Sequence, residues 1–215
     1  MGAMNRQSPV RFPSRAEKSA TRNHWTVVLE YDDEGAGPWL VDLCHKTRWD
    51  LQDGRLDDLR PCGLPVPPVP GECRVEGRVL VNRMNRTQAA VWHLGNGETP
   101  ELPADNGYTD VSEATVSLAL FGPKVRFITE KLTALDFMAP SLQPPFLLQG
   151  PFSHVPCQIV TLERGPDGAG MLLLSASRGY AQDMVHAILE AGKEFGLRPA
   201  GESAFGRYLE AVVAP

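Results

Sequence analysis

The stretch of sequence that decides the fold is Thr109–Asp136, which reads TDVSEATVSLALFGPKVRFITEKLTALD. An Asp-Val-Ser turn precedes the apolar run Thr115–Phe121, which has the length and composition of a buried strand. Gly122 ends this strand, and Pro123 fits the first turn of a helix, where its missing N–H costs no hydrogen bond. Apolar residues then recur at helical spacing among charged ones, namely Val125, Ile128, Leu132 and Leu135. The stretch therefore predicts a strand followed at once by an amphipathic helix.

Downstream of this unit, the pattern predicts a hairpin and a second helix. Cys157–Glu163 and Gly170–Ala176 are apolar, strand-like runs on either side of a glycine-containing turn. Ser177 can cap a helix, and apolar residues at helical spacing follow over Arg178–Phe195. Gly196 stands where helices commonly end in a left-handed residue.

The remaining segments of the second half complete the fold class. The proline-rich segment Pro140–Pro156 is predicted as a loop, and the last segment, Ala204–Val213, as a strand. The order strand, helix, two strands, helix, strand is typical of an α+β fold. We therefore expect antiparallel sheets with helices packed on one face.

The first half of the chain is predicted as strands joined by turns. Four runs have strand-like composition: Trp25–Tyr31, Trp39–Cys44, Arg78–Met84 and Gln88–Leu94. Between the second and third runs lies Pro61–Pro70, which has five prolines in ten positions. Since proline fixes φ and lacks a backbone donor, we expect an extended connector on the surface rather than a strand or a helix.

The distribution of charge and of loop-forming residues divides the chain into three regions. Residues 1–24 hold five basic side chains and one acidic one, whereas the whole chain has a formal net charge of −5, so a flexible basic arm is expected to precede an acidic body. Residues 25–104 are expected to form a first α+β half and residues 105–215 a second. The loop 96–105 is either a domain boundary or a connection between two layers of one domain.

Composition places the chain among globular proteins. Of its 215 residues 42% are hydrophobic and 22% charged, and no apolar run approaches the ~18–20 residues of a membrane span. The opening residues lack the apolar core of a secretory signal, so the four cysteines are expected as free thiols in a reducing cytoplasm. The acidic body argues against nucleic acid as a ligand.

A metal site is not predicted. Cys44, His45, Cys62 and Cys73 could be assembled into a zinc set, but zinc ligands normally come in close pairs on a tight turn. The gaps of 18 and 11 residues between these cysteines provide no such pair. The fourth cysteine, Cys157, lies in a strand-like apolar run.

Catalytic residues are not predicted either. The sequence has no Gly-x-Ser-x-Gly elbow and no glycine-rich phosphate loop. Cys44 and His45 could act as a dyad only if their side chains met, but neighbours on a strand point to opposite faces, so we expect a buried thiol beside a surface imidazole. Gly122–Lys124 could bind an anion at a helix start, although structural punctuation is the favoured interpretation. His186 is expected on the solvated face of the second helix.

Three segments together carry a family resemblance: GPWLVDLCHKTRWDLQDG (37–54), DVSEATVSLALFGPKVRFITEKLTALD (110–136) and GMLLLSASRGYAQDMVHAILEAGKEFGLRP (170–199). In that order they resemble the Asp-Leu-Ser-His segment, the Gly-Pro-Lys strand–helix unit and the tyrosine helix ending in Glu-Ala-Gly of glycine-cleavage T proteins, which are aminomethyltransferases. Cys44 replaces the serine of the first motif. The resemblance implies a T-protein-like folate-binding fold, most clearly over residues 105–215.

Chain length narrows this resemblance. At 215 residues the chain is expected to lack the C-terminal barrel domain of the T protein, and it resembles the gamma subunit of heterotetrameric sarcosine oxidase. That resemblance implies a structural partner in one-carbon metabolism, accompanied by a flavin-bearing oxidase subunit and a folate-binding subunit.

Two departures from the family concern its folate site. The Thr-Asn-Asp motif, whose aspartate interacts with the folate amine, is replaced by Arg55–Leu59, where Asp57 and Asp58 are the nearest carboxylates. The Tyr-Thr-Gly-Glu folate contact is replaced by Arg164–Gly170. The resemblance thus implies tetrahydrofolate as a ligand, but no residue of this chain can be assigned to bind it.

The sequence therefore predicts a non-catalytic, cytoplasmic subunit that resembles sarcosine oxidase gamma and acts in a one-carbon (methylamine- or sarcosine-type) oxidoreductase complex. Candidate docking features are the basic arm Arg6–Arg22, the proline-rich connector 61–70, and Trp39 or Trp49. For the two tryptophans, packing in the core is the alternative.

Two other functions stay open. One is a folate-dependent aminomethyl- or methyltransferase-like enzyme or a folate-binding accessory protein. It would need a carboxylate (Asp42, Asp57 or Asp58) facing a cavity between the two halves. The other is an assembly factor with a transient partner.

Overall fold

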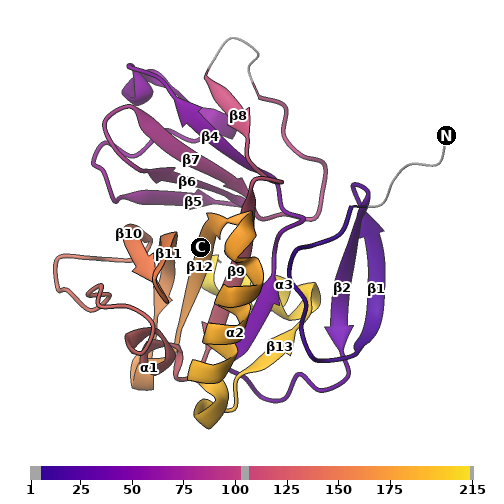
Figure 1. The fold of residues 1–215 in the computed structure, drawn as a ribbon. Helices are drawn as coiled ribbons and strands as arrows, with labels where there is room; N and C mark the ends of the chain where they lie inside the picture. The colour runs from indigo at the N-terminus through magenta and orange to yellow at the C-terminus, as the bar shows by residue number, and fades with distance from the viewer. Residues whose placement is uncertain (1–5, 103–106, 214–215) are drawn as a thin grey trace.

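The computed structural model describes residues 6–102 and 107–213. The first five residues of the predicted arm, the predicted boundary at 104–105 and the last two residues lie outside this description. Three sheets form the described chain, namely a six-stranded sheet, a five-stranded sheet packed against it and a separate two-stranded hairpin (Figure 1).

The six-stranded sheet is antiparallel except at one edge, where β13 runs parallel to β3. Its strands in spatial order are β10 (Phe146–Phe152), β11 (Val155–Arg164), β12 (Gly170–Ser177), β9 (Thr115–Gly122), β3 (Trp39–Asp42) and β13 (Arg198–Ala200). The central pair β12–β9 is in continuous register from Gly170 opposite Gly122 to Ser177 opposite Thr115.

The other two sheets are built from the first half of the chain and one later strand. The five-stranded sheet has the order β5 (Cys73–Glu76), β6 (Val79–Arg83), β7 (Gln88–His93), β4 (Arg48–Gln52) and β8 (Tyr108–Asp110). The hairpin pairs β1 (Ala16–Arg22) with β2 (Trp25–Tyr31), and it lies to the side of both larger sheets (Figure 1).

Helices are few and short. The α-helices are α1 (Val125–Glu130), α2 (Ala181–Gly192) and α3 (Glu202–Val213). The 3-10 turns are η1 (Leu56–Asp58), η2 (Pro61–Gly63), η3 (Pro166–Gly168), η4 (Arg178–Tyr180) and η5 (Lys193–Phe195). Because η4 and η5 flank α2, the predicted helix over 178–195 is confirmed, and Gly196 ends it with a φ of 75° as predicted.

Both faces of the six-stranded sheet are buried, by different layers. Along β9, Leu118 and Leu120 belong to the core under α1 and α2, whereas Ala119 and Phe121 belong to the core shared with the five-stranded sheet and α3. This alternation is the two-residue period of a strand. The far face of the five-stranded sheet is covered by the segment around Leu64. The fold class expected from the sequence, α+β with antiparallel sheets, is confirmed. The helices were expected on one face, but α1 and α2 cover one face of the six-stranded sheet and α3 packs on the other.

The stretch that decides the fold forms β9 and α1 in the predicted order. However, α1 begins at Val125, so Pro123 lies in the turn before the helix, and α1 stops at Glu130 instead of continuing to Leu135. The chain leaves the helix because it bonds to the turn between β10 and β11. Leu132 accepts a backbone hydrogen bond from Ser153, and the Thr133 hydroxyl donates to Pro151.

Two predicted elements are wrong in type. Ala204–Val213 belongs to a helix, α3, because Phe205 and Leu209 lie one helical turn apart on one buried face, a spacing that alternation does not fit. Within the predicted loop 140–156, Phe146–Phe152 forms β10. Its proline is tolerated because β10 is an edge strand, where one side needs no backbone donor. Ser177, the predicted cap, makes no side-chain capping bond.

Part of the predicted basic arm, residues 16–22, has regular structure. These residues form β1, and their charges are paired by acids of the chain itself, as in Lys18–Glu30 at 3.6 Å and Arg22–Glu202 at 3.0 Å. Arg6 likewise pairs with Glu113 at 3.0 Å. The expected excess of free positive charge is therefore largely compensated within the chain.

The sheets also do not divide the chain at residue 104. β3, from the first half, lies in the sheet of the second half, and β8, from the second half, lies in the sheet of the first. The proline-rich connector is only partly on the surface, because Leu64 and Val66 are buried against the five-stranded sheet.

Candidate functional site

The segment after β3, Asp42–Lys46, is the part of the family-like sequence that the structure buries most completely. The Asp42 carboxylate accepts a hydrogen bond from the Cys44 backbone at 2.9 Å, which turns the chain out of the strand. The Cys44 thiol packs on β9, where the Ser117 N–H lies 3.4 Å from Sγ. Burial, helped by the charge of Asp42, raises the pKa of Cys44 to about 12. The thiol is therefore protonated at neutral pH and is not a nucleophile.

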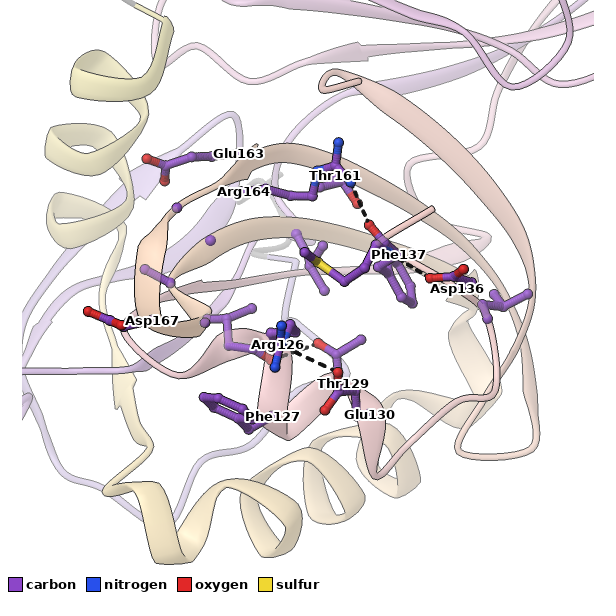
Figure 2. Close-up of a pocket in the computed structure, with 18 residues that line it drawn as sticks. Arg126, Phe127, Thr129, Glu130, Asp136, Phe137, Thr161, Glu163, Arg164 and Asp167 are labelled. Carbon is purple, nitrogen blue, oxygen red and sulfur yellow. Dashed lines mark hydrogen bonds and ion pairs between the residues drawn. The ribbon is translucent and has the colours of Figure 1, made fainter. Parts of the chain in front are cut away.

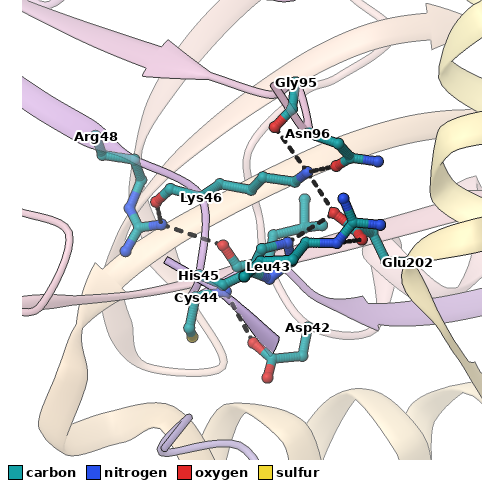
Figure 3. A network of polar contacts seen from close by, with 10 residues as sticks. Asp42, Leu43, Cys44, His45, Lys46, Arg48, Gly95, Asn96 and Glu202 are labelled. Atoms are coloured by element: carbon teal, nitrogen blue, oxygen red, sulfur yellow. Dashed lines mark hydrogen bonds and ion pairs between the residues drawn. The ribbon is translucent and has the colours of Figure 1, made fainter. Parts of the chain in front are cut away.

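His45 and Lys46 converge on one carboxylate from the far end of the chain. His45 Nε2 lies 2.8 Å and Lys46 Nζ 2.5 Å from Oε1 of Glu202, the first residue of α3. Arg22 Nε of β1 lies 3.0 Å from Oε2 of the same side chain. Lys46 also donates to the Gly95 carbonyl at 3.0 Å and to the Asn96 side chain (Figure 3). We call Arg22, His45, Lys46, Asn96 and Glu202 the Glu202 cluster.

The pKa values in this cluster follow from burial and from ion pairing. Burial alone would raise the pKa of Glu202, but the hydrogen bond from His45 and the charge of Lys46 outweigh it and lower that pKa to about 2. Burial lowers the pKa of both His45 and Lys46, while Glu202 acts in the opposite direction. The expectation of a surface imidazole at His45 is wrong, because its side chain is only 7% exposed.

The lysine and the carboxylate at the centre of the Glu202 cluster are closed to solvent, whereas Arg22 is 32% exposed and Asn96 lies at the surface. The side chain of Lys46 is 3% exposed and that of Glu202 is 2% exposed. Four segments that are distant in sequence supply its members: β1, the segment after β3, the loop after β7 and α3. Because Lys46 and Glu202 neutralise each other, the cluster stabilises the contact between these segments. It is not arranged as an acid–base pair that faces a substrate.

A second buried cation explains the Asp-Val-Ser motif. Arg48 is 1% exposed, and its guanidinium donates to the carbonyls of Lys46 at 2.7 Å and Ser112 at 2.6 Å, among others. Asp110 shapes this turn by accepting from the Ser112 backbone at 2.8 Å, and the Ser112 hydroxyl accepts from the Arg48 backbone at 2.9 Å. The motif therefore anchors the point where the chain passes between the two large sheets.

The three carboxylates considered for folate do not come together. Asp57 pairs with Arg83 at 2.7 Å on the outer side of the five-stranded sheet and is 76% exposed, and Asp58 beside it is also exposed. Asp42 borders a cavity of about 220 Å³ that it shares with Trp25 of the hairpin, among others. This cavity lies beside the hairpin and is not lined by the five-stranded sheet.

The cysteines and histidines of the imagined zinc set are likewise apart. Cys62 lies in η2 on the connector and Cys73 in β5, whereas Cys44 and His45 follow β3. Over residues 6–102 and 107–213, no group of three or more His, Cys, Asp or Glu side chains is placed to hold a metal ion. All four cysteines are free thiols.

Neither tryptophan considered for docking stands free on the surface. Trp49 is 7% exposed in the core of the five-stranded sheet. Trp39 is half-buried, with its ring 5.5 Å from that of Phe121 and its indole N–H donated to Glu34. Core packing, the alternative considered for both residues, is therefore the correct interpretation.

Gly122–Lys124 serves as a structural corner rather than an open anion site. Gly122 has a φ of 105° and packs against the Trp39 ring, and Lys124 takes a left-handed conformation with a φ of 62°. The Lys124 ammonium reaches the Asp167 carbonyl at 3.4 Å, so it ties the start of α1 to the turn between β11 and β12.

A large pocket lies next to this corner. Its volume is about 490 Å³, and it is enclosed by α1, the segment 135–138 and the hairpin β11–β12 with its turn (Figure 2). The sequence did not predict it, because the pocket is assembled from segments that carry no motif. The one segment of the pocket to which the sequence drew attention is the turn Arg164–Gly170, and only because it replaces the Tyr-Thr-Gly-Glu motif.

Comparison with known proteins supports the resemblance seen in the sequence. No family model matches the chain. Over 126 residues, 59% of this chain, it is 27% identical to an aminomethyltransferase of Thermoanaerobacter sp. strain X514 and 28% identical to that of Caldanaerobacter subterraneus subsp. tengcongensis. The matched part is 32% of each relative, so the chain spans about a third of their length.

The fold matches a chain of heterotetrameric sarcosine oxidase from Corynebacterium sp. U-96, a structure in complex with pyrrole 2-carboxylate. The TM-score is 0.60 at 16% identity, over 75% of this chain and 88% of that one. Together the two comparisons confirm the resemblance to the T-protein-like superfamily and the shared fold with sarcosine oxidase. No helix within the described part of the chain is long and apolar enough to cross a membrane.

Proposed function

We propose that this chain is a non-catalytic, T-protein-like subunit of a heteromeric oxidoreductase that acts on a one-carbon amine of the sarcosine type. The observation that carries the proposal is the extent of the structural match, 88% of a chain from a heterotetrameric sarcosine oxidase. The match to aminomethyltransferases covers only 32% of those enzymes. Because this chain matches nearly the whole of one subunit but only about a third of the enzymes, the role of a subunit is favoured over that of an enzyme.

The chemistry of the buried groups supports a structural role. Cys44 is a protonated thiol that packs on β9, and the buried side chains of His45 and Lys46 are held by the buried Glu202 carboxylate. Asp57 is paired on the outer side of the five-stranded sheet. Each residue that the sequence offered for catalysis or folate binding is thus either committed to another part of the fold or separated from the others.

The proposed partners are a flavin-dependent oxidase-like subunit and a folate-binding-like subunit, in a cytoplasmic complex. The proposal is tested by purifying the tagged chain from its native host at low salt and identifying what remains bound after size-exclusion chromatography. A flavoprotein in fixed stoichiometry, seen by the visible absorption of flavin and by mass spectrometry, is the expected result. A monomer that carries no flavoprotein would contradict it.

A folate-binding accessory protein or an aminomethyltransferase-like enzyme is the second candidate. It is favoured by the sequence match to aminomethyltransferases and by the 220 Å³ cavity beside Asp42. Titration of the purified chain with tetrahydrofolate separates the two candidates. Micromolar binding that is weakened in Asp42→Asn but not in Asp58→Asn would favour this second function over the first.

A further inference from the structure

The 490 Å³ pocket lies on the face of the six-stranded sheet that carries α1 and α2. Its floor is the cross-strand pair Thr161 of β11 and Leu172 of β12. The five-stranded sheet packs on the opposite face of the same strands, through residues such as Val160 and Leu173. The pocket shares no lining residue with the cavity beside Asp42, which lies at β3 and the hairpin.

Thr161 on this floor has an unexplained hydroxyl. The residue is 1% exposed, and its Oγ1 has no hydrogen-bond partner among residues 6–102 and 107–213. The neighbouring threonine on α1, Thr129, is also buried but donates to the Val125 carbonyl at 2.8 Å. Buried polar groups in native proteins nearly always have a partner, so the Thr161 hydroxyl is a hydrogen-bonding group left free beneath the pocket.

The walls of the pocket are apolar and held in place. The Phe127 ring rests on Gly168, where an added Cβ would lie 2.6 Å from the ring. The Arg164 guanidinium donates to the Phe137 carbonyl at 3.1 Å and to the Leu142 carbonyl, which fixes the wall segment that carries Phe137. Two aromatic rings in fixed positions and a volume within the usual range of ligand sites indicate a preformed pocket for a small molecule.

Charge at the rim determines which kind of small molecule fits. Arg126 pairs with Glu130 at 3.3 Å, whereas Arg164 donates to the neutral carbonyls of Phe137 and Leu142 and so keeps its charge. Three further carboxylates line the pocket, those of Asp136, Glu163 and Asp167, and Asp136 and Asp167 lie on opposite sides in Figure 2. The carboxylates therefore outnumber the cations, and an excess of negative charge above an apolar floor attracts a cation and repels an anion.

We propose that this pocket binds a small aryl-alkyl amine: an aromatic body between Phe127 and Phe137, a protonated amine near the rim carboxylates and a polar group that pairs with the Thr161 hydroxyl. The rim charge disfavours folates, whose glutamate tail is itself anionic. The inference does not depend on the proposed function, because this chain alone lines the pocket and no partner subunit is needed.

The test titrates the full chain with three probes of similar size. Binding of each probe is measured by ligand-observed NMR. Tyramine has the aromatic ring, the amine and a hydroxyl, phenethylamine lacks the hydroxyl, and 3-(4-hydroxyphenyl)propionate replaces the amine by a carboxylate. We expect roughly millimolar binding of tyramine, as usual for a ligand of about ten heavy atoms. Phenethylamine should bind about two- to tenfold more weakly and the propionate more weakly still.

Two variants assign the effects to residues. Thr161→Val is isosteric, and it should remove the preference for tyramine over phenethylamine without weakening phenethylamine. Asp136→Asn can still accept the backbone hydrogen bond from Met138, and it should weaken both amines about two- to fivefold. Asp58→Asn removes the same charge from the exposed turn η1, away from the pocket, and is the matched control, with no expected effect. Circular dichroism shows whether each variant is folded.

The outcomes are distinct. Failure of all three probes to bind, or binding of the propionate as tightly as of tyramine, would overturn the proposal. So would an unchanged preference for tyramine in Thr161→Val. Tight binding of tetrahydrofolate that competes with tyramine would also contradict it, and would point to the folate-binding alternative.

Discussion

Glu202 is the residue at which the fold is tied together. Its carboxylate receives His45 and Lys46 on one oxygen and Arg22 on the other, so β1, the segment after β3 and α3 meet there (Figure 3). The carboxylate also stands at the N-terminus of α3, where a negative charge is favoured by the helix dipole. A buried ion pair contributes little compared with an apolar packing, but breaking one leaves a buried charge without a partner.

At this scale we predict that Glu202→Gln destabilises the chain by about 3–5 kcal/mol, because Lys46 then remains buried without its counter-charge. Urea denaturation of the purified protein measures the change. The control is Glu210→Gln on the same helix, which removes a 64% exposed partner of Arg78 and should change stability by less than about 1 kcal/mol. Equal, small effects of both substitutions would show that the Glu202 cluster does not stabilise the fold.

The same residues predict how stability depends on pH. The folded pKa of His45 is lowered, so the unfolded chain binds the proton first and stability falls as the pH drops below about 6.5. The folded pKa of Glu202 is also lowered, so its contribution is complete above its ordinary value of 4.5 and is lost as the pH falls toward about 2. Unfolding free energies measured from pH 8 to pH 2 should therefore decline once the pH falls below about 6.5, and decline less steeply below pH 4.5 in Glu202→Gln. A flat profile would contradict the cluster geometry.

At the scale of elements, turn residues and hydrophobic periodicity predicted correctly those elements that pack against segments adjacent in sequence. The alternation in β9, the Gly-Pro corner before α1 and the hairpin β11–β12 are all local patterns, and the structure has them. The errors arise where a distant segment decides. α1 ends early because Leu132 bonds to the β10–β11 turn, and α3 is a helix because its apolar residues face the five-stranded sheet and β9.

The docking of α3 gives a prediction at this scale. Gly201, just before α3, lies so close to β2 that an added Cβ would be 2.1 Å from the Leu29 carbonyl, whereas at Gly206 within α3 a Cβ would meet nothing within 4 Å. Gly201→Ala should therefore destabilise the chain by about 1–3 kcal/mol or more through overpacking. Gly206→Ala should stabilise it by about 0.5–1 kcal/mol, since alanine favours a helix interior.

Thermal unfolding of the two glycine variants checks this pair of predictions. Opposite shifts of the melting temperature are expected, downward for Gly201→Ala and upward for Gly206→Ala. A neutral Gly201→Ala would mean that the contact between the start of α3 and β2 is looser than described. Both variants add one methyl group, at positions five residues apart. A general effect of added methyl groups therefore cannot shift the melting temperature in opposite directions.

At the scale of the whole molecule, the sequence predicted the fold class but not the Glu202 cluster. It drew attention to Asp42, Cys44 and His45 through the family-like motif, but Glu202 is 157 residues from His45 and stands in a segment predicted as a strand. The pocket over Thr161 was missed for a similar reason, since its walls come from α1, residues 135–138 and β11–β12. Contacts between distant segments leave no local pattern.

The whole-molecule account also explains why a resemblance to an enzyme need not bring its chemistry. The comparisons match the scaffold, over 59% of this chain in sequence and 75% in structure. Within that scaffold, the motif-like residues Cys44 and Ser112 make structural bonds. The proposal of a structural subunit rests on this combination.

The most direct test of that central claim is the mass and composition of the particle in which the chain occurs in its native host. The chain alone has a mass of 23.5 kDa. The account predicts that the tagged chain elutes in a larger complex of constant composition that contains a flavoprotein, and that the separated chain has no oxidase or aminomethyltransferase activity of its own. Elution at 23.5 kDa without a partner, together with activity of the chain alone on an amine and tetrahydrofolate, would contradict it.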